Sequence, residues 1–457
     1  MKFAIKSRRV LYKDKLTALS VVSENGRIKD ICSYNESFDC RTEDFGDLVI
    51  MPGLCDSHVH INEPGREDWE GFETATMAAA AGGITFIADM PLNSLPVTTN
   101  EASFDKKTES AKNKLYCDTG FYGGLVPDNI NELNKLSEKG VLGIKAFMID
   151  SGLEEFPRVN ENHIREAIKV LKSNSEKTGR GRHNQIPLLV HAEIAGESKL
   201  SGNYSKYSFK SFLEARPAEW ESSAVGMLIN LCRESDYHIH IVHVSAASSV
   251  EMIRKAKKEG LPLTVETCPH YLYFSSEEIP DNDTRFKCTP PIRDSANREI
   301  LWDAVKDGTI DFVVSDHSPC NPVLKFIEEG NFAEAWGGIS GLQFSLPVFW
   351  TQARKRGVTV PELSELMSSG TSGFLNSGKR IGKIEKGYDA DFTVFDPESK
   401  FTVEKKNIFH RHKETPYTGK ELYGIVNHTF LRGNKVFEKG KIVSDPSGEI
   451  ILREKTS

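Results

Sequence analysis

The chain has 457 residues and a mass of 51.0 kDa, and 39% of its residues are hydrophobic while 27% are charged. This composition supports a large core and excludes general disorder, and at roughly 150 residues per domain the length predicts about three domains. Acidic residues number 65 against 58 Lys and Arg, with a pI near 6.1, which argues against a surface that binds the phosphates of nucleic acids.

No apolar run approaches the roughly 18 residues that a membrane-spanning helix needs. The start of the chain, MKFAIKSRR, lacks the apolar core of a secretory signal. The eight cysteines are scattered and include no CxxC pair, which favours reduced, buried thiols over a zinc ribbon or a disulfide framework. We therefore expect a cytoplasmic protein whose partner is a small molecule, and which binds neither nucleic acid nor a membrane.

Residues 1–50 contain short alternating strands separated by turns such as Glu24-Asn25-Gly26. The middle of the chain, residues 51–380, instead alternates short apolar runs with longer stretches of helical composition. Eight strand-then-helix units of this kind are typical of a (β/α)8 barrel, a fold of the α/β class. Helices are predicted over 75–81, 161–173, 222–232, 248–258 and 296–306. Strands are predicted at 54–60, 84–90, 118–123, 143–148, 187–191, 238–244, 262–267 and 311–315.

Residues 381–457 return to the pattern of the first 50 residues, with predicted strands at 391–395, 424–430 and 435–443. Neither flank is long enough to form a β-domain by itself. Together they predict one small β-sandwich, in which the two chain ends meet beside the barrel. The expected number of domains therefore falls from three to two.

A His-x-His pair marks the end of the first predicted barrel strand. Side chains two residues apart share one face of a strand, so His58 and His60 can reach one metal ion together. Such pairs also occur as ordinary strand residues, and His238 and His240 form one near the start of the sixth strand. Because the active-site face of a barrel is where its strands end, we expect this second pair to be structural and His243 to be functional.

The same rule predicts further polar residues at strand ends. The fifth strand ends in His191, Asp316 follows the eighth, and the fourth carries Lys145 within an apolar run. Burying a charged lysine is costly, so it either pairs with a carboxylate or loses its proton and reacts with carbon dioxide. The second route gives a carbamate that can bridge two cations. The salt bridge is favoured for Lys145 in isolation, whereas four histidines and an aspartate at strand ends favour the carbamate.

The segment 51–60, MPGLCDSHVH, resembles the signature of the cyclic amidohydrolases, the family of dihydroorotases, hydantoinases and allantoinases. The segment 382–391, GKIEKGYDAD, is similar to the point where that family re-enters its sandwich domain, and the resemblance extends to about Val443. It implies a barrel with a composite β-sandwich, two divalent metal ions and a homotetramer. The ligand types suit zinc, and they also accept manganese, cobalt or iron.

The resemblance also assigns ligands and a catalytic residue. His58, His60 and Asp316 are implied to hold one metal ion, His191 and His243 the other, and N6-carboxylated Lys145 to bridge them. Asp316 is the expected catalytic residue, which carries a proton to the leaving nitrogen when a cyclic amide is hydrolysed.

Within the family, the segments HINEPGR at 60–66 and SDHSPC at 315–320 resemble the allantoinase branch, which opens the hydantoin ring of allantoin to allantoate in purine degradation. Asn62 stands where dihydroorotases usually carry Arg, and Asp150 stands where hydantoinases carry Tyr. A dihydroorotase or a hydantoinase is the alternative. A non-catalytic scaffold related to dihydropyrimidinase is disfavoured because all six ligand positions are filled.

Four residues are candidate substrate contacts, because a hydantoin ring with a ureido tail offers several donors and acceptors. Asn93 follows the second strand, Ser318 is close to Asp316, and Thr289 and Gly338 lie on later loops. Each could instead be a turn or cap residue. His270 and His317 are close to the site in sequence, and we expect them to support it rather than to bind metal.

Overall fold

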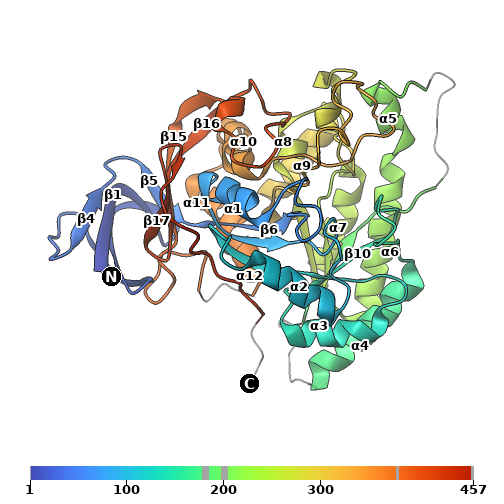
Figure 1. Ribbon diagram of the computed structural model, residues 1–457, viewed down its shortest axis with the longest axis horizontal. Helices are drawn as coiled ribbons and strands as arrows, with labels where there is room; N and C mark the ends of the chain where they lie inside the picture. The colour runs from blue at the N-terminus through green and yellow to red at the C-terminus, as the bar shows by residue number, and fades with distance from the viewer. Residues whose placement is uncertain (1, 178–184, 197–203, 377–379, 454–457) are drawn as a thin grey trace.

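Eight strand positions form a closed parallel barrel in the part of the chain that this computed structural model describes, residues 2–177, 185–196, 204–376 and 380–453 (Figure 1). The barrel closes where Val59 forms a parallel bridge with His317 and the His60 amide donates to the His317 carbonyl oxygen at 2.8 Å. All eight predicted strands are present. They are β6 (Leu54–Val59), β7 (Ile84–Asp89), β8 (Asp118–Phe121) continued by β9 (Gly123–Gly124), β10 (Ile144–Phe147), β11 (Leu188–His191), β12 (Ile239–Ile241), β13 (Leu263–Thr267) and β14 (Phe312–Val313).

Helices alternate with these strands and pack around the barrel (Figure 1). In α7, Val250, Ile253 and Ala256 are buried at helical spacing, and lysines occupy the last turn, where they complement the helix dipole. None of the described helices is both long enough and apolar enough to cross a bilayer. The helices are α1 (Phe72–Ala81), α2 (Glu101–Ala111), α3 (Leu133–Lys139), α4 (Glu161–Lys177), α5 (Phe209–Ala215), α6 (Ala218–Ser235), α7 (Val250–Lys258), α8 (Pro269–Tyr273), α9 (Ser295–Lys306), α10 (Ser345–Ala353), α11 (Val360–Ser364) and α12 (Gly370–Phe374), and the five predicted ones are among them.

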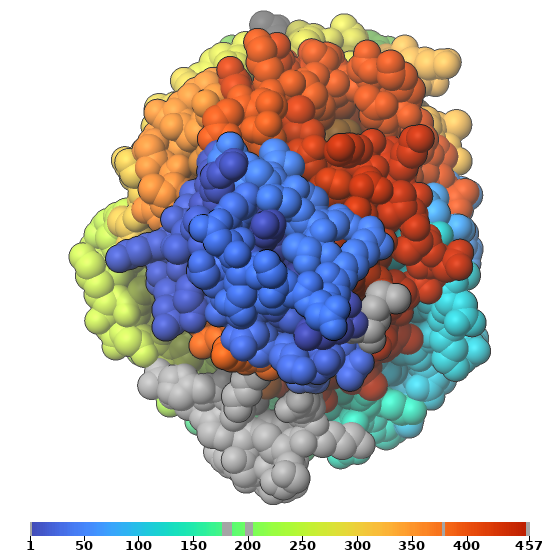
Figure 2. Space-filling view, turned by 90° about the vertical axis from the view of Figure 1, so that its left-hand side faces the viewer, coloured from blue at the N-terminus to red at the C-terminus, as the bar shows by residue number. Residues whose placement is uncertain are grey.

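The two chain ends form a nine-stranded sheet within the described residues, in the order β3-β2-β1-β5-β15-β16-β17-β18, with β4 also paired to β1. The ends join where β5 runs antiparallel to β15, from Val49 opposite Phe395 to Pro52 opposite Phe392. Figure 2 shows N-terminal residues in blue lying directly beside C-terminal residues in red. The strands are β1 (Lys2–Tyr12), β2 (Lys15–Glu24), β3 (Arg27–Ser33), β4 (Arg41–Asp44), β5 (Val49–Pro52), β15 (Phe392–Thr402), β16 (Glu421–Leu431), β17 (Asn434–Glu438) and β18 (Lys441–Ile442).

Apolar side chains from both ends share one cluster, which includes Ile5, Ile50 and Phe392. The composite β-structure predicted from the sequence is therefore confirmed. One predicted element was wrong in detail: residues 435–443 form the hairpin β17–β18 rather than one strand, because Lys439 and Gly440 adopt φ values of 44° and 85°.

The chain passes from sheet to barrel at Gly53, between β5 and β6. A Cβ at this position would lie 2.1 Å from Oγ1 of Thr85 on β7, so the close approach of the chain to this strand requires glycine. The domain limits 1–50, 51–380 and 381–457 stay predictions, and residues 1 and 454–457 of the two flanks lie outside the described part of the chain.

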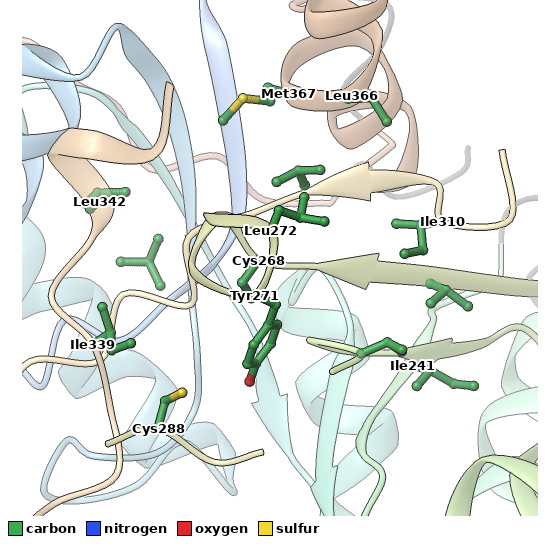
Figure 3. Close-up of a cluster of buried hydrophobic side chains, with 14 of the residues drawn as sticks. Ile241, Cys268, Tyr271, Leu272, Cys288, Ile310, Ile339, Leu342, Leu366 and Met367 are labelled. Atoms are coloured by element: carbon green, nitrogen blue, oxygen red, sulfur yellow. The ribbon is translucent and has the colours of Figure 1, made fainter. Parts of the chain in front are cut away.

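An apolar cluster holds the loops at one end of the barrel (Figure 3). It joins Ile241 of β12 to Tyr271 of α8 and to Cys288 and Ile339 on later loops. The buried Tyr271 hydroxyl donates to the Pro290 carbonyl oxygen at 2.7 Å. The backbone beside Thr289 is thereby anchored to the barrel core.

A buried ion pair ties the C-terminal flank to the barrel. Nη1 of Arg432, directly after β16, lies 2.5 Å from Oδ1 of Asp118, the first residue of β8. The Asp118 side chain is only 3% exposed, and burial raises its pKa while Arg432 opposes that rise. Removing the guanidinium leaves this carboxylate buried without its cation.

We predict that Arg432→Met destabilises the protein by about 3 kcal/mol or more, because breaking a buried ion pair strands one charge. The measurement is chemical or thermal unfolding of the metal-free protein. The matched control is Arg8→Met, because the Arg8–Asp47 pair is exposed at both ends, and it should change stability by less than about 0.5 kcal/mol. Equal effects of the two substitutions would contradict the role of the buried pair.

Candidate metal centre

Two histidines and one aspartate converge where the barrel closes. His58 lies near the end of β6, His60 follows that strand, and Asp316 follows β14. Oδ1 of Asp316 lies 3.2 Å from Nε2 of His58 and 3.5 Å from Nε2 of His60. All three residues are buried, and their ligand atoms lie within 4.8 Å of one another. Such a set can hold a divalent cation.

A second pair of histidines lies beside this cluster. His191 ends β11 and His243 follows β12, and their ring centroids are 4.5 Å apart. The His243 ring is also 5.4 Å from the His58 ring, which connects the two groups. Phe147, at the end of β10, stacks on His191 with a centroid distance of 4.5 Å. The strand-end residues predicted from the sequence are thus brought together in one place.

Lys145 on β10 is fully buried, and its Nζ has no hydrogen-bond partner among the described residues. Nζ lies 5.0 Å from the centroid of the Phe147 ring. Burial lowers the pKa of Lys145 to about 8. Its charge in turn helps to lower the pKa of His60 and of His243, which places it electrostatically within the same centre.

Two buried carboxylates orient the histidine rings. Nδ1 of His58 lies 2.5 Å from Oε1 of Glu266, and Nε2 of His191 lies 2.7 Å from Oε2 of Glu193. Arg216 Nη2 donates to the same Glu193 oxygen at 2.5 Å. A carboxylate on the far ring nitrogen is the usual support for a metal-binding histidine, since it fixes the tautomer and the ring angle.

The sequence reasoning missed Glu193 and Glu266. A signal for both was present, because Glu266 interrupts the apolar run of β13 and Glu193 follows His191 by two residues. A buried acid within a strand is as costly as the buried Lys145, so the same argument would have marked Glu266, whereas Glu193 lies just after the end of β11.

Burial and neighbouring charges put the ligands in the protonation states that bind metal. Burial lowers the pKa of His60 to about 4, so its imidazole is neutral at pH 7. Burial raises the pKa of Asp316, but the neighbouring His58 and the hydrogen bond with His60 outweigh burial and lower the pKa to about 2. An ionised carboxylate and neutral imidazoles are the ligand forms of these residues.

The backbone is strained at two of these residues. His243 and Asp316 have φ values of 38° and 44°, a region that non-glycine residues rarely adopt. Hydrogen bonds hold the strained segment at Asp316, where the Ser315 amide donates to Asp56 Oδ2 at 2.9 Å. Strain of this kind is typical of functional sites, where the surrounding structure over-determines the backbone.

The residues present fit a divalent metal site. Nδ1 of His60, Nδ1 of His243 and Nζ of Lys145 are buried nitrogens that lack a hydrogen-bond partner among the described residues. Buried polar atoms are normally hydrogen-bonded, so three such nitrogens close together indicate that a bound group, such as a cation, completes the site. Imidazole and carboxylate donors suit zinc and neighbouring divalent ions.

Three of the four residues predicted to contact the substrate, Thr289, Ser318 and Gly338, lie close together. A Cβ at Gly338 would lie 2.2 Å from the Ser318 carbonyl oxygen, and one at Gly337 would lie 3.1 Å from Thr289 Cγ2. The buried ammonium of Lys325 ties these loops, since Nζ donates to the carbonyl oxygens of Lys287, Trp336 and Gly338 at 2.8, 2.8 and 2.5 Å.

Asn93 lies on a different loop, which follows β7. It is buried with a φ of 69°, and its Oδ1 has no partner in the described structure. Arg66 Nη1 donates to its carbonyl oxygen at 3.2 Å. His317, by contrast, has a structural contact, because its Nδ1 accepts from the Gly341 amide at 3.1 Å. Substrate contact stays a prediction for all four residues.

Comparisons with known proteins identify the family of this chain. A profile of the amidohydrolase family matches residues 49–442. The chain is 43% identical to a protein named allantoinase from Arabidopsis thaliana, over 98% of this chain and 90% of the relative. It is 42% identical to a probable allantoinase 2 from Dictyostelium discoideum, over 95% of this chain and 90% of the relative. An L-hydantoinase (dihydropyrimidinase) from Arthrobacter aurescens has the same fold, with a TM-score of 0.90 and 27% identity over 99% of both chains.

The barrel with its buried His-His-Asp cluster at the strand ends defines a hydrolase of the metal-dependent barrel class. The chain belongs to the amidohydrolase family, whose profile covers most of its length. The family expected from the segment MPGLCDSHVH is therefore confirmed.

We predict that metal-free Lys145→Met is more stable at pH 7 than the metal-free wild type. The native pKa near 8 is below the unfolded value of about 10.4, so the unfolded chain binds the proton more readily. The stability lost in this way is about 3 kcal/mol at pH 7, and the wild type recovers it as the pH rises from 8 to 10.5.

Denaturant unfolding of both proteins in buffer free of carbon dioxide, at pH 7, 8.5 and 10, measures this effect. The stability difference should shrink steadily with pH. A difference that is constant from pH 7 to 10 would mean that the buried amine is not the destabilising group.

Proposed function

We propose that this chain is an allantoinase, which hydrolyses the hydantoin ring of allantoin to give allantoate in purine degradation. The observation that carries the proposal is the contrast in identity: 43% to a plant protein named allantoinase, against 27% to a hydantoinase with the same fold. Both comparisons span nearly the whole chain, so the difference is not confined to one segment.

The proposed centre holds two divalent cations, most simply zinc, with manganese, cobalt or iron as other candidates. His58, His60 and Asp316 would hold one, and His191 and His243 the other. When bound, such ions acidify a water molecule and polarise an amide carbonyl.

Carboxylated Lys145 would lie between the two cations. A pKa near 8 supports this assignment, because a useful fraction of the amine is then neutral at pH 7 and can attack carbon dioxide. The ammonium first loses one proton to become the neutral amine, and formation of the N–C bond releases a second, so that a buried cation becomes an anionic ligand.

Asp316 is the residue proposed to move the proton during ring opening. Its low pKa keeps the carboxylate ionised at neutral pH, so it can accept a proton from the attacking water. It then returns that proton to the leaving ring nitrogen, which is a poor leaving group unless protonated. Its contacts with His58 and His60 hold the carboxylate oriented for both steps.

The proposed substrate contacts are Asn93, Thr289, Ser318 and Gly338. The Asn93 Oδ1 without a partner suits a donor on the substrate, and the backbone around Gly338 suits a ring amide. We also propose a homotetramer, which sedimentation or light scattering would test. The cytoplasmic location stays a prediction from the sequence.

Dihydroorotase activity would require a cation for the substrate carboxylate, and Arg66 is poorly placed to supply it. Its Nη2 pairs with Glu155 Oε1 at 3.2 Å, and its guanidinium lies over the Trp69 ring at 5.3 Å. Asn62, where dihydroorotases carry arginine, is fully buried, and its Nδ2 donates to the Pro319 carbonyl oxygen at 3.0 Å. Both observations favour a neutral substrate at this position.

We predict that the purified protein binds about two divalent ions per chain and hydrolyses allantoin at least tenfold faster, by kcat/KM, than dihydroorotate, dihydrouracil or hydantoin. Elemental analysis and a substrate panel under identical metal loading measure the two quantities. Faster hydrolysis of dihydroorotate would replace the proposal with its nearest rival. Full activity without bound metal would reject the proposed centre.

We predict that Asp316→Asn lowers kcat on allantoin by about 100-fold to 10,000-fold, because the amide cannot shuttle the proton. The exposed Asp39→Asn, between β3 and β4 of the sheet, is the matched control and should keep near wild-type turnover. Metal content is measured alongside activity. Near-normal kcat with metal retained in Asp316→Asn would remove Asp316 as the proton carrier.

A further inference from the structure

The second His-x-His pair of the chain lies in the barrel interior and belongs to no part of the proposed centre. His240 on β12 is fully buried, and its ring stacks on Phe312 with centroids 5.3 Å apart and lies 4.3 Å from the Phe374 ring. Its Nε2 lies 3.1 Å from Oε2 of Glu266, and its Nδ1 lies 2.9 Å from Oγ1 of Thr264. Both ring nitrogens therefore face polar groups of the neighbouring strand β13.

These contacts extend into a continuous chain. Glu266 also contacts Nδ1 of His58 at 2.5 Å, and Thr264 Oγ1 also contacts Nε2 of His238 at 2.8 Å. Strand register explains the alignment, because His240 pairs with Thr264 across β12 and β13, and Glu266 follows on the same face of β13. The chain runs from the metal centre to His238, which is half-buried at the start of β12.

Glu266 is a buried acceptor that needs donors. Its side chain is fully buried, with Oε1 facing His58 and Oε2 facing His240. No lysine or arginine of the described residues forms an ion pair with it, so His58 Nδ1 and the more distant Ser57 hydroxyl are its side-chain hydrogen-bond donors, while Nε2 of His240 faces Oε2 at 3.1 Å as a close polar contact.

The donor and acceptor roles then follow in order. A carboxylate accepts, so we take the imidazole nitrogens that face Glu266 to carry the protons: Nδ1 of His58, which donates at 2.5 Å, and Nε2 of His240, which lies 3.1 Å from Oε2 outside hydrogen-bond geometry. Nδ1 of His240 then accepts from the Thr264 hydroxyl, whose oxygen in turn accepts from Nε2–H of His238. In this arrangement Nε2 of His58 carries no proton, and this nitrogen lies 3.2 Å from Asp316 in the proposed centre.

We propose that Thr264 and His240 are positioning residues for the metal centre: they orient Glu266, which holds His58 in the tautomer whose Nε2 binds the cation. The inference rests on the proposed metal centre and extends it to two residues that touch no ligand atom. Residues of this kind affect metal affinity through the tautomer and angle of the ligand they support.

Two near-isosteric substitutions separate this role from simple packing. Thr264→Val removes the hydroxyl and keeps the branched shape, and His240→Phe keeps an aromatic ring between Phe312 and Phe374 but loses both nitrogens. We expect each to weaken zinc binding about tenfold, as measured by competition with a zinc chelator of known affinity. Thr264→Ser restores the hydroxyl and should return the affinity to that of the wild type.

Matched controls make the same changes away from the centre. Thr429→Val removes a buried hydroxyl that donates to the Ala80 carbonyl oxygen at 2.6 Å, and His428→Phe replaces a buried histidine of β16. Both controls should leave zinc affinity unchanged. Unfolding of the metal-free proteins is measured in parallel, so that any loss of stability is known for each variant.

The outcomes are distinct. Wild-type zinc affinity in Thr264→Val and His240→Phe would overturn the inference while leaving the proposed function intact. Equal loss in Thr264→Val and Thr264→Ser would also overturn it, since packing rather than the hydroxyl would then control binding. Absence of zinc binding in the wild type would instead reject the metal centre and, with it, the proposed function.

Discussion

The centre depends on the closure of the barrel between its first and last strands. The backbone bond from His60 to the His317 carbonyl oxygen, together with the bridge from Val59 to His317, holds the ends of β6 and β14 side by side. His58 and Asp316 come from opposite ends of the barrel sequence, and only this closure makes them neighbours. Without this closure, Asp316 would be too far from His58 and His60 to contact them. The pair His191 and His243 would then have no His-His-Asp cluster beside it.

The barrel buries several ionisable side chains beside the proposed metal centre. Lys145 carries an unpaired amine, whereas Glu193 and Glu266 face the outer nitrogens of His191 and His58. Such groups cost stability in the metal-free protein, because their charges are removed from water. When cations bind to such a site, they stabilise the folded protein and offset the cost of burying these groups. The lower stability of the metal-free protein is a common consequence of building a functional site.

The residues proposed to contact the substrate lie on loops rather than strands, and contacts separate from the proposed metal ligands hold these loops in place. Lys325 places its ammonium among three backbone carbonyls, and Tyr271 anchors the backbone near Thr289 through a hydrogen bond to Pro290. Rigid loops of this kind favour a pre-formed pocket. Arg66 is engaged with Glu155, so charge recognition contributes little at this side of the site.

The sequence by itself determined the barrel, the composite sheet and the family, because strand periodicity, helical stretches and short motifs are local properties of the chain. It also marked His58, His60, Lys145, His191, His243 and Asp316 through one rule, that barrel strands end at the functional face. The hairpin at Lys439–Gly440 was missed, because a turn inside an alternating run has a weak local signal. Only the tertiary structure decided that Glu193 and Glu266 support the histidines and that His240 joins them, because contacts between strands distant in sequence depend on register and closure.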